Sequence, residues 1–171
     1  MLRILFLIAF NISLSACSNF SQPGAAITEQ QLAGHETLSI DTLTVKVTEQ
    51  GDLTATMELA RRYALGDGVE QNGETALRLY QVVIKSDYDY NVLSGYTAIA
   101  QTRIGRLYLD GVSPIKQDFI EAFLWFDRVI NRHGQHVSVD NEAVLRYHNF
   151  ARLNMTDAER VELKRRLKQS P

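Results

Sequence analysis

The sequence contains little cysteine and little net charge. Its 171 residues include one cysteine, Cys17, and the formal net charge at pH 7 is −2. One cysteine excludes an internal disulfide, so packing alone must hold the fold together. A small negative charge argues against a nucleic-acid partner, because proteins that bind nucleic acids carry a strongly basic surface. Hydrophobic residues make up 45% of the chain, which is ordinary for a globular protein.

The motifs of common catalytic sites are also missing. The sequence has no G-x-S-x-G, no H-E-x-x-H, no phosphate-binding loop and no dinucleotide fingerprint. His133 and His136 offer two nitrogen ligands, but they flank a glycine and lack a partnered acidic pair, which makes a weak metal signal. We therefore predict no catalytic residue, no metal and no cofactor.

The first apolar stretch has the features of a secretory signal peptide. Residues 1–16 carry one positive charge, at Arg3, followed by an apolar run over residues 4–10 and by small residues before Cys17. The segment is too short and too polar to span a bilayer comfortably, which favours a cleaved signal over a membrane helix.

The end of this segment resembles the lipobox of bacterial lipoproteins. The residues are Leu14-Ser15-Ala16-Cys17, and the resemblance implies cleavage before Cys17 and attachment of diacylglycerol to its sulfur. The alternative is a secreted protein with an incidental cysteine. Ser18, in place of aspartate, favours the outer membrane by resemblance to the sorting of such lipoproteins. Residues 17–36 are then a lipidated, flexible tether to a domain over residues 37–171.

Two later stretches repeat each other. Residues 54–84 and 97–130 match at identical spacing, apart from a connection that is one residue longer in the second copy. A fixed internal repeat is typical of stacked repeat proteins, whose units are too small to bury an apolar face alone. The matched positions are Ala55, Leu59, Ala60, Tyr63, Gly66, Asn72, Ala76, Leu79, Tyr80, Val83 and Ile84 with Ala100, Ile104, Gly105, Tyr108, Gly111, Asp118, Ala122, Trp125, Phe126, Val129 and Ile130.

Within each copy the apolar residues follow helical spacing. Ala100, Ile104 and Tyr108 lie four apart and form one stripe on a first helix. The second helix has apolar residues at i, i+3, i+4 and i+7, a wide core-facing stripe on which we expect Trp125 to be buried. Gly111 suits the end of the first helix, because glycine accepts a left-handed backbone. Each copy is thus predicted as two antiparallel helices joined by a short turn.

Other local signals refine this prediction. The small residues at Ala60 and Gly105 occupy equivalent positions, where they would let two helix backbones approach closely. Asp52 is expected to cap the first repeat helix, and the Thr156–Glu159 pair reads as a capping box before a final amphipathic helix. The cations near the end of that helix suit the helix dipole.

The repeated pattern resembles the Sel1-like repeat, a relative of the tetratricopeptide repeat. It covers roughly residues 43–134, as G-D-x-x-A-x-x-x-L-A/G-x-x-Y-x-x-G followed by an acidic or Asn position and A-x-x-W/L-Y/F. The resemblance implies an all-α fold, a right-handed α-solenoid of two repeats plus capping helices. The two copies are offset by 46 residues, from Ala76 to Ala122, so residues 87–96 read as an insertion.

Two segments leave alternatives open. Residues 38–50 favour a strand by propensity but also fit helical spacing, and we favour a capping helix. The insertion over residues 87–96 is either a binding loop or a surface connection whose tyrosines cover helix ends. The arginines beside the first-helix stripes either line a groove or are solvated. The candidate partner-binding residues are Arg62, Tyr88, Tyr90, Tyr96, Arg103 and Arg106.

By resemblance, the function is binding: a lipid-anchored scaffold facing the periplasm that presents a groove to a protein or peptide. The membrane is contacted through the anchor, and no nucleic acid is involved. Two alternatives remain at this point. One is an envelope hydrolase acting on cell-wall or β-lactam substrates, and the other is a structural subunit of a secretion or adhesion machine.

Overall fold

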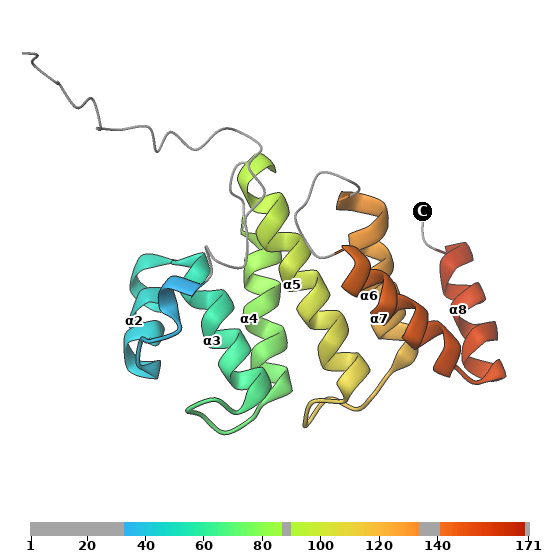
Figure 1. Ribbon diagram of the computed structural model, residues 1–171, viewed down its shortest axis with the longest axis horizontal. Coiled ribbons are helices and arrows are strands. Elements are labelled where there is room, and N and C mark those ends of the chain that lie inside the picture. Colours follow the sequence, from blue (N-terminus) through green and yellow to red (C-terminus); the bar gives the residue numbers. More distant parts are fainter. Residues whose placement is uncertain (1–32, 87–89, 134–140, 170–171) are drawn as a thin grey trace, which may run out of the picture.

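The computed structural model describes residues 33–86, 90–133 and 141–169, and in these ranges the chain consists of helices and short connections (Figure 1). Cys17, Tyr88 and His136 lie outside the described residues, as does the side chain of Tyr90. The elements are a 3₁₀ helix η1 (Ala33–His35) and the α-helices α2 (Ile40–Gln50), α3 (Leu53–Leu65), α4 (Gly73–Lys85), α5 (Tyr90–Asp110), α6 (Phe119–His133), α7 (Asn141–Asn154) and α8 (Asp157–Gln169).

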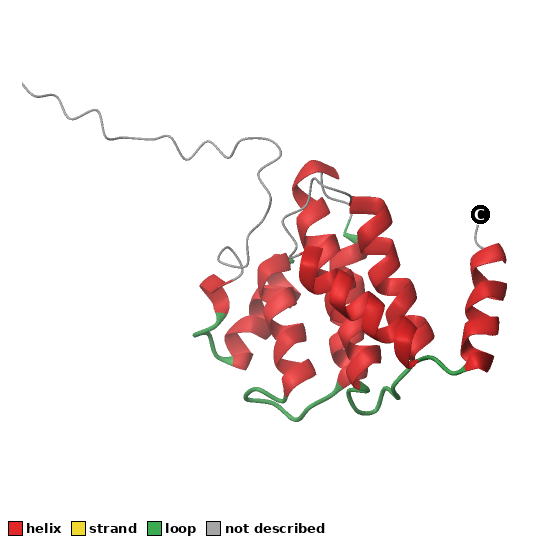
Figure 2. Cartoon of the chain, turned by 45° about the vertical axis from the view of Figure 1, so that its right-hand side comes forward, coloured by secondary structure: helices red, strands yellow, loops and turns green. Residues whose placement is uncertain are grey.

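Each helix from α2 to α6 packs against the next along the chain, so the helices from α2 to α7 form a row (Figure 1). This arrangement confirms the predicted α-solenoid, with α3–α4 and α5–α6 as the two repeats. Helix α8 stands at the far end of the row, as Figure 2 also shows. It meets the core through the buried Leu163 and meets α6 through Arg166, whose Nη1 lies 2.6 Å from Glu121 Oε1.

Residues 40–50 form a helix, which confirms the capping helix at this end of the solenoid. Ser39 caps it by accepting a hydrogen bond from the Thr42 amide, and Leu43 is buried against α3. Threonine favours strands by propensity, but here Thr44 and Thr48 donate their hydroxyls to carbonyls one turn back within the helix. That bonding is a known way for threonine to sit in a helix.

The two repeat turns are closed by the same bonds. Gly66 and Gly111 have φ of 74° and 66°, as predicted for glycines that end a helix. In each turn a glutamine side chain donates to a carbonyl near the end of the first helix, from Gln71 to Ala64 at 3.0 Å and from Gln117 to Leu109 at 2.8 Å. These bonds satisfy carbonyls that a helix end leaves without partners.

The predicted N-caps are confirmed. Asp52 accepts from the amides of Thr54 and Ala55 at 2.9 and 3.0 Å. Thr156 and Glu159 form the capping box, because the Thr156 amide donates to the carboxylate and the Glu159 amide donates to the threonine hydroxyl. These caps fix where α3 and α8 begin.

The stripe on the second repeat helix is buried, except at its edge. Phe126 is fully buried, like its counterpart Tyr80, but Trp125 is only partly buried. The guanidinium of Arg128 lies over the Trp125 ring, 4.4 Å from its centroid. The prediction that Trp125 is buried between the repeat helices is therefore only partly correct, because Trp125 packs against the core there but keeps part of its surface exposed. Position i+3 lies at the margin of the stripe, and its counterpart Leu79 is also partly buried.

Gly105 accommodates an aromatic ring, not a second helix backbone. A Cβ at Gly105 would lie 2.6 Å from Cε1 of Phe126. The close backbone approach occurs at Gly73, whose amide donates to the Ser113 carbonyl at 2.7 Å and whose Cβ position is occupied by the Val112 carbonyl. The start of α4 is thereby joined to the turn of the second repeat.

The inserted residues are not a loop where the structure describes them. Residues 90–96 form the first turns of α5, which has 21 residues against 13 in α3. The expectation of a binding loop at these residues is therefore wrong, and residues 87–89 lie outside the described part. Within the described residues, no helix combines the length and apolar character that crossing a membrane requires.

Candidate functional site

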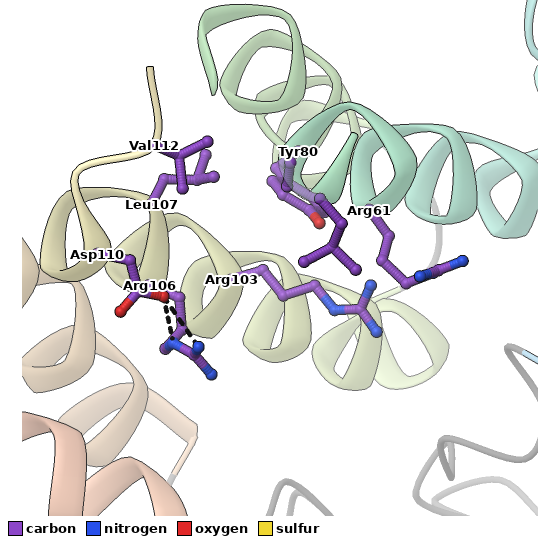
Figure 3. A pocket seen from close by; sticks show the side chains of 9 residues that line it. Arg61, Tyr80, Arg103, Arg106, Leu107, Asp110 and Val112 are labelled. Atoms are coloured by element: carbon purple, nitrogen blue, oxygen red, sulfur yellow. Dashed lines mark hydrogen bonds and ion pairs between the residues drawn. The ribbon is translucent and has the colours of Figure 1, made fainter. Parts of the chain in front are cut away.

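A groove of about 200 Å³ runs between the first helices of the two repeats (Figure 3). Helices α3 and α5 supply its walls, the end of α5 and the following turn supply one rim, and Tyr80 of α4 reaches its floor. This position follows from the repeat, since equivalent helices lie on the same side of the row. The lining residues are Arg61, Ala64, Leu65, Tyr80, Arg103, Arg106, Leu107, Asp110 and Val112.

The groove has an apolar part that is open to solvent. Leu65 is 63% exposed at the end of α3, and beside it lie Ala64, Leu107 and Val112. Leu107 is buried and fixed by the core, whereas Leu65 leaves most of its side chain in water. An exposed leucine next to a concave apolar surface is suited to contact with another molecule.

Arg61 stands on the α3 wall with its charge compensated. Its Nε and Nη2 donate to Glu58 at 2.8 Å, and Nη2 also donates to Asp67 at 2.8 Å. The hydrogen bond to Glu58, with a smaller contribution from Asp67, raises the pKa of Arg61 above its usual value, although partial burial acts in the other direction. Arg61 is therefore a charged side chain on the α3 wall of the groove, and two carboxylates hold it in place.

Arg62, by contrast, is a structural residue, and its prediction as part of the partner surface is wrong. Only 7% of Arg62 is exposed. Its Nε lies 2.9 Å from Glu58, and Nη2 donates to the Glu36 carbonyl at 2.7 Å. Arg62 thus fastens the segment before α2 onto α3. Burial raises the pKa of Glu58, but bonds from Arg61 and Arg62 outweigh it and leave that pKa below its usual value.

Arg106 joins the second repeat to the next helix. It pairs with Asp110 at 2.9 Å, donates to the Tyr147 hydroxyl at 3.0 Å, and lies over the Tyr147 ring at 4.8 Å from its centroid. In Figure 3 its side chain turns toward Asp110, away from Tyr80. Arg106 lines the groove, which was one of the two alternatives that the sequence left open, and α7 helps to fix its position.

Arg103 has a different environment. It is half-buried on α5, and in Figure 3 it extends toward Arg61 beside the Tyr80 hydroxyl. Burial raises the pKa of Tyr80, and the positive charge of Arg103 opposes that rise. No carboxylate among the described residues forms an ion pair with Arg103. Arg103 is thus the groove cation whose charge is not compensated within the described structure.

Tyr96 is committed to the fold. Its hydroxyl lies 2.9 Å from the Thr54 hydroxyl, and its ring packs against the core between the repeats. The structure therefore brings Arg103 and Arg106 together at one groove and places Tyr96 and Arg62 elsewhere, in contacts that join segments of the chain.

The sequence did not single out Leu65 and Tyr80 as members of the groove. Tyr80 fitted the pattern of a buried core residue, and its hydroxyl nevertheless reaches the floor of the groove. Leu65 carried a usable signal, since it lies off the Tyr63 stripe and next to the glycine that ends the helix.

The chemistry of this lining is that of recognition. Tyr80 has a raised pKa, so it stays protonated at neutral pH and is a poor base. Asp110 is paired with Arg106. In the described part of the chain, no three His, Cys, Asp or Glu side chains gather in a way that could hold a metal ion. The weak metal signal of His133 and His136 falls partly outside the described residues, because His136 is not among them.

A model of the Sel1 repeat matches residues 54–82 and 98–129, which are the two helix pairs α3–α4 and α5–α6. The chain contains two Sel1 repeats. The groove lies between their first helices, and Arg61 and Arg106 line it from the first and the second Sel1 repeat respectively.

Two solved structures are similar to this chain to different degrees. A protective antigen present in uropathogenic Escherichia coli strains, displaying an SLR fold, is similar with a TM-score of 0.51 and 17% identity; the match covers 73% of this chain and 23% of that one. This chain thus spans under a quarter of that antigen. A Sel1 repeat protein from Oxalobacter formigenes has 22% identity and a TM-score of 0.35, over 73% of this chain and 96% of that one. The search of curated proteins found no match. At 17% identity the likeness to the antigen structure establishes the fold alone.

Proposed function

We propose that this chain is a lipid-anchored scaffold of the bacterial envelope that holds a segment of a partner protein in the groove between its two Sel1 repeats. Sel1 repeats support a role in protein interaction. The observation that carries the proposal is the groove itself, with an exposed Leu65 beside uncompensated Arg103.

The size of the groove favours a protein segment over a small-molecule substrate. Sites for small molecules commonly enclose about 300–1,000 Å³, whereas this groove offers about 200 Å³. That space suits one or two side chains projecting from a longer chain. The lining also pairs no nucleophile with a base, because its hydroxyl belongs to the buried Tyr80 and its carboxylate, Asp110, is bound to Arg106.

The envelope location rests on the sequence Leu14-Ser15-Ala16-Cys17 and its resemblance to a lipobox. On this proposal, residues 1–16 are removed, Cys17 carries the lipid, and residues 17–36 connect it to the domain over residues 37–171. Ser18 favours an outer membrane protein facing the periplasm.

A pull-down from envelope extract tests the scaffold function. The baits are the parent chain, Leu65→Ser in the groove and Val82→Ser outside it. Both changes replace a well-exposed aliphatic side chain, 63% and 51% exposed, with a small polar one. We expect the parent and Val82→Ser to capture the same protein and Leu65→Ser to capture clearly less. Equal capture by all three baits would show that the partner does not bind in the groove.

A further inference from the structure

We infer that the groove selects partner segments in which an acidic side chain adjoins an apolar one, and that Arg103 receives the acidic group. This inference rests on the proposed function, because it names the chemistry of the segment that the groove would hold. The ligand is a side-chain carboxylate within a protein chain.

The charges of the groove single out Arg103. Arg61 is held by Glu58 and Asp67, and Arg106 is held by Asp110, all at 2.8–2.9 Å. Among the described residues, these carboxylates pair with neighbours other than Arg103. The groove therefore carries one positive charge that the described structure does not compensate, at a fixed place on its α5 wall.

The surroundings of Arg103 strengthen its attraction for an anion. Its side chain is half-buried on the groove wall beside the Tyr80 hydroxyl (Figure 3), and charges interact more strongly at a partly buried site than at a fully exposed one. Guanidinium groups also bind carboxylates with two parallel hydrogen bonds, which fixes orientation.

The apolar requirement comes from the rest of the lining. Ala64, Leu65, Leu107 and Val112 lie in the same groove as Arg103. A segment that placed a carboxylate at Arg103 without an apolar neighbour would leave Leu65 in water. A segment with an apolar side chain alone would exclude water from the guanidinium and leave it with the Tyr80 hydroxyl but no anionic partner, which is unfavourable. The two features together match the groove.

Selection from a displayed library of random peptides, presented without a free C-terminus, tests the inference. The bait is the full chain, purified in detergent. We expect the parent to enrich peptides with Asp or Glu beside an apolar residue. Arg103→Glu should abolish that preference and shift it toward Lys or Arg. A synthetic peptide from the parent selection should bind Arg103→Gln about 10- to 100-fold more weakly, the range for one lost charged hydrogen bond.

Arg78→Glu is the matched control, because it makes the same change of charge on α4 at a side chain that is 66% exposed and outside the groove lining. It should leave the selected sequences unchanged. Circular dichroism spectra of Arg103→Glu and Arg103→Gln should match that of the parent. A variant that fails this check is replaced by Arg103→Lys. That variant should keep the preference for acidic peptides but bind them more weakly.

Failure of the inference and failure of the proposed function give different results. Peptides whose binding is weakened by Leu65→Ser, but which carry no acidic residue, would overturn the charge preference and leave the groove as the binding site. Peptides insensitive to Leu65→Ser, or no enriched peptide at all, would overturn both. Selection unchanged by Arg103→Glu would remove Arg103 from the recognition of the acidic group.

Discussion

The ring of Phe126 occupies the space that a side chain at Gly105 would need. A Cβ at Gly105 would lie 2.6 Å from Cε1 and 2.8 Å from Cζ of Phe126, closer than non-bonded carbons approach. Phe126 is fully buried and stacks on Tyr147 at 5.7 Å between ring centroids, so it has little freedom to move aside. This contact joins the two helices of the second Sel1 repeat and connects them to α7.

Gly105→Ala should therefore destabilise the protein. Alanine favours a helix over glycine by about 1 kcal/mol, but overpacking of a core typically costs about 1–3 kcal/mol. We expect the free energy of unfolding, measured by urea denaturation, to fall. The double variant Gly105→Ala/Phe126→Leu should lose less than the two single changes added together, because the smaller side chain makes room. An increase in stability for Gly105→Ala would show that the ring can shift freely.

Phe126 and Trp125 are neighbours with unequal roles in stability. Phe126→Ala should lower the free energy of unfolding by about 3–5 kcal/mol, the usual cost of removing a buried aromatic ring. Trp125→Ala should cost less, about 1–2 kcal/mol, since Trp125 is partly exposed beneath Arg128. Thermal unfolding of the two variants gives the comparison. A larger loss of stability for Trp125→Ala than for Phe126→Ala would show that Trp125 contributes more to the core than its partial exposure indicates.

The repeat made most of this fold predictable from sequence. Matching residues such as Tyr80 and Phe126 had to be buried together, and the turn glycines marked the helix ends. The first turns of α5 were missed because the 46-residue offset between the copies made residues 87–96 look like an insertion outside the repeat. In the structure Gly95 is buried within a continuous helix, so these residues extend the first helix of the second repeat.

Asp52 should make stability depend on pH in the acid range. Burial raises the pKa of Asp52, but the Ala55 amide, with His35 and Lys46, outweighs this and leaves it below its usual value. A lowered carboxyl pKa contributes stability at higher pH that is lost as the pH falls through the folded-state pKa. The loss should occur below the ordinary carboxyl pKa of about 3.9.

Asp52→Asn isolates this effect, because asparagine caps a helix about as well as aspartate and does not titrate. We expect the stability advantage of the parent over Asp52→Asn to be present near neutral pH and to shrink on acidification. Urea unfolding of both proteins over a pH series measures it. A difference that stays constant down to pH about 2 would contradict the role assigned to the carboxylate.

Cys17→Ser should leave the chain without acyl groups. Two or more acyl chains bind a membrane stably, whereas one is marginal. The variant should therefore lose radiolabelled fatty acid and leave the outer-membrane fraction. Ser18→Ala, which keeps the cysteine, serves as the control and should retain the label. Fatty-acid labelling that persists in Cys17→Ser would disprove attachment at this residue.

The groove was only partly predictable from sequence. Arg62 and Arg103 looked alike, since both lie beside an apolar stripe on a first helix. Their roles differ because Arg62 meets Glu58 one turn earlier and the Glu36 carbonyl from a distant segment, whereas Arg103 faces Tyr80. Contacts between segments far apart in the sequence decide such roles, and helical spacing carries no information about them.

The central claim is that the groove between the two Sel1 repeats holds a partner protein. Photocrosslinking in intact bacteria tests it most directly, with benzoylphenylalanine placed at Leu65 in the groove or at Val82 outside it. The account predicts a discrete crosslinked protein from the Leu65 position, reduced by the additional change Arg103→Glu, and no such product from the Val82 position. A product from Val82 with none from Leu65 would contradict the claim.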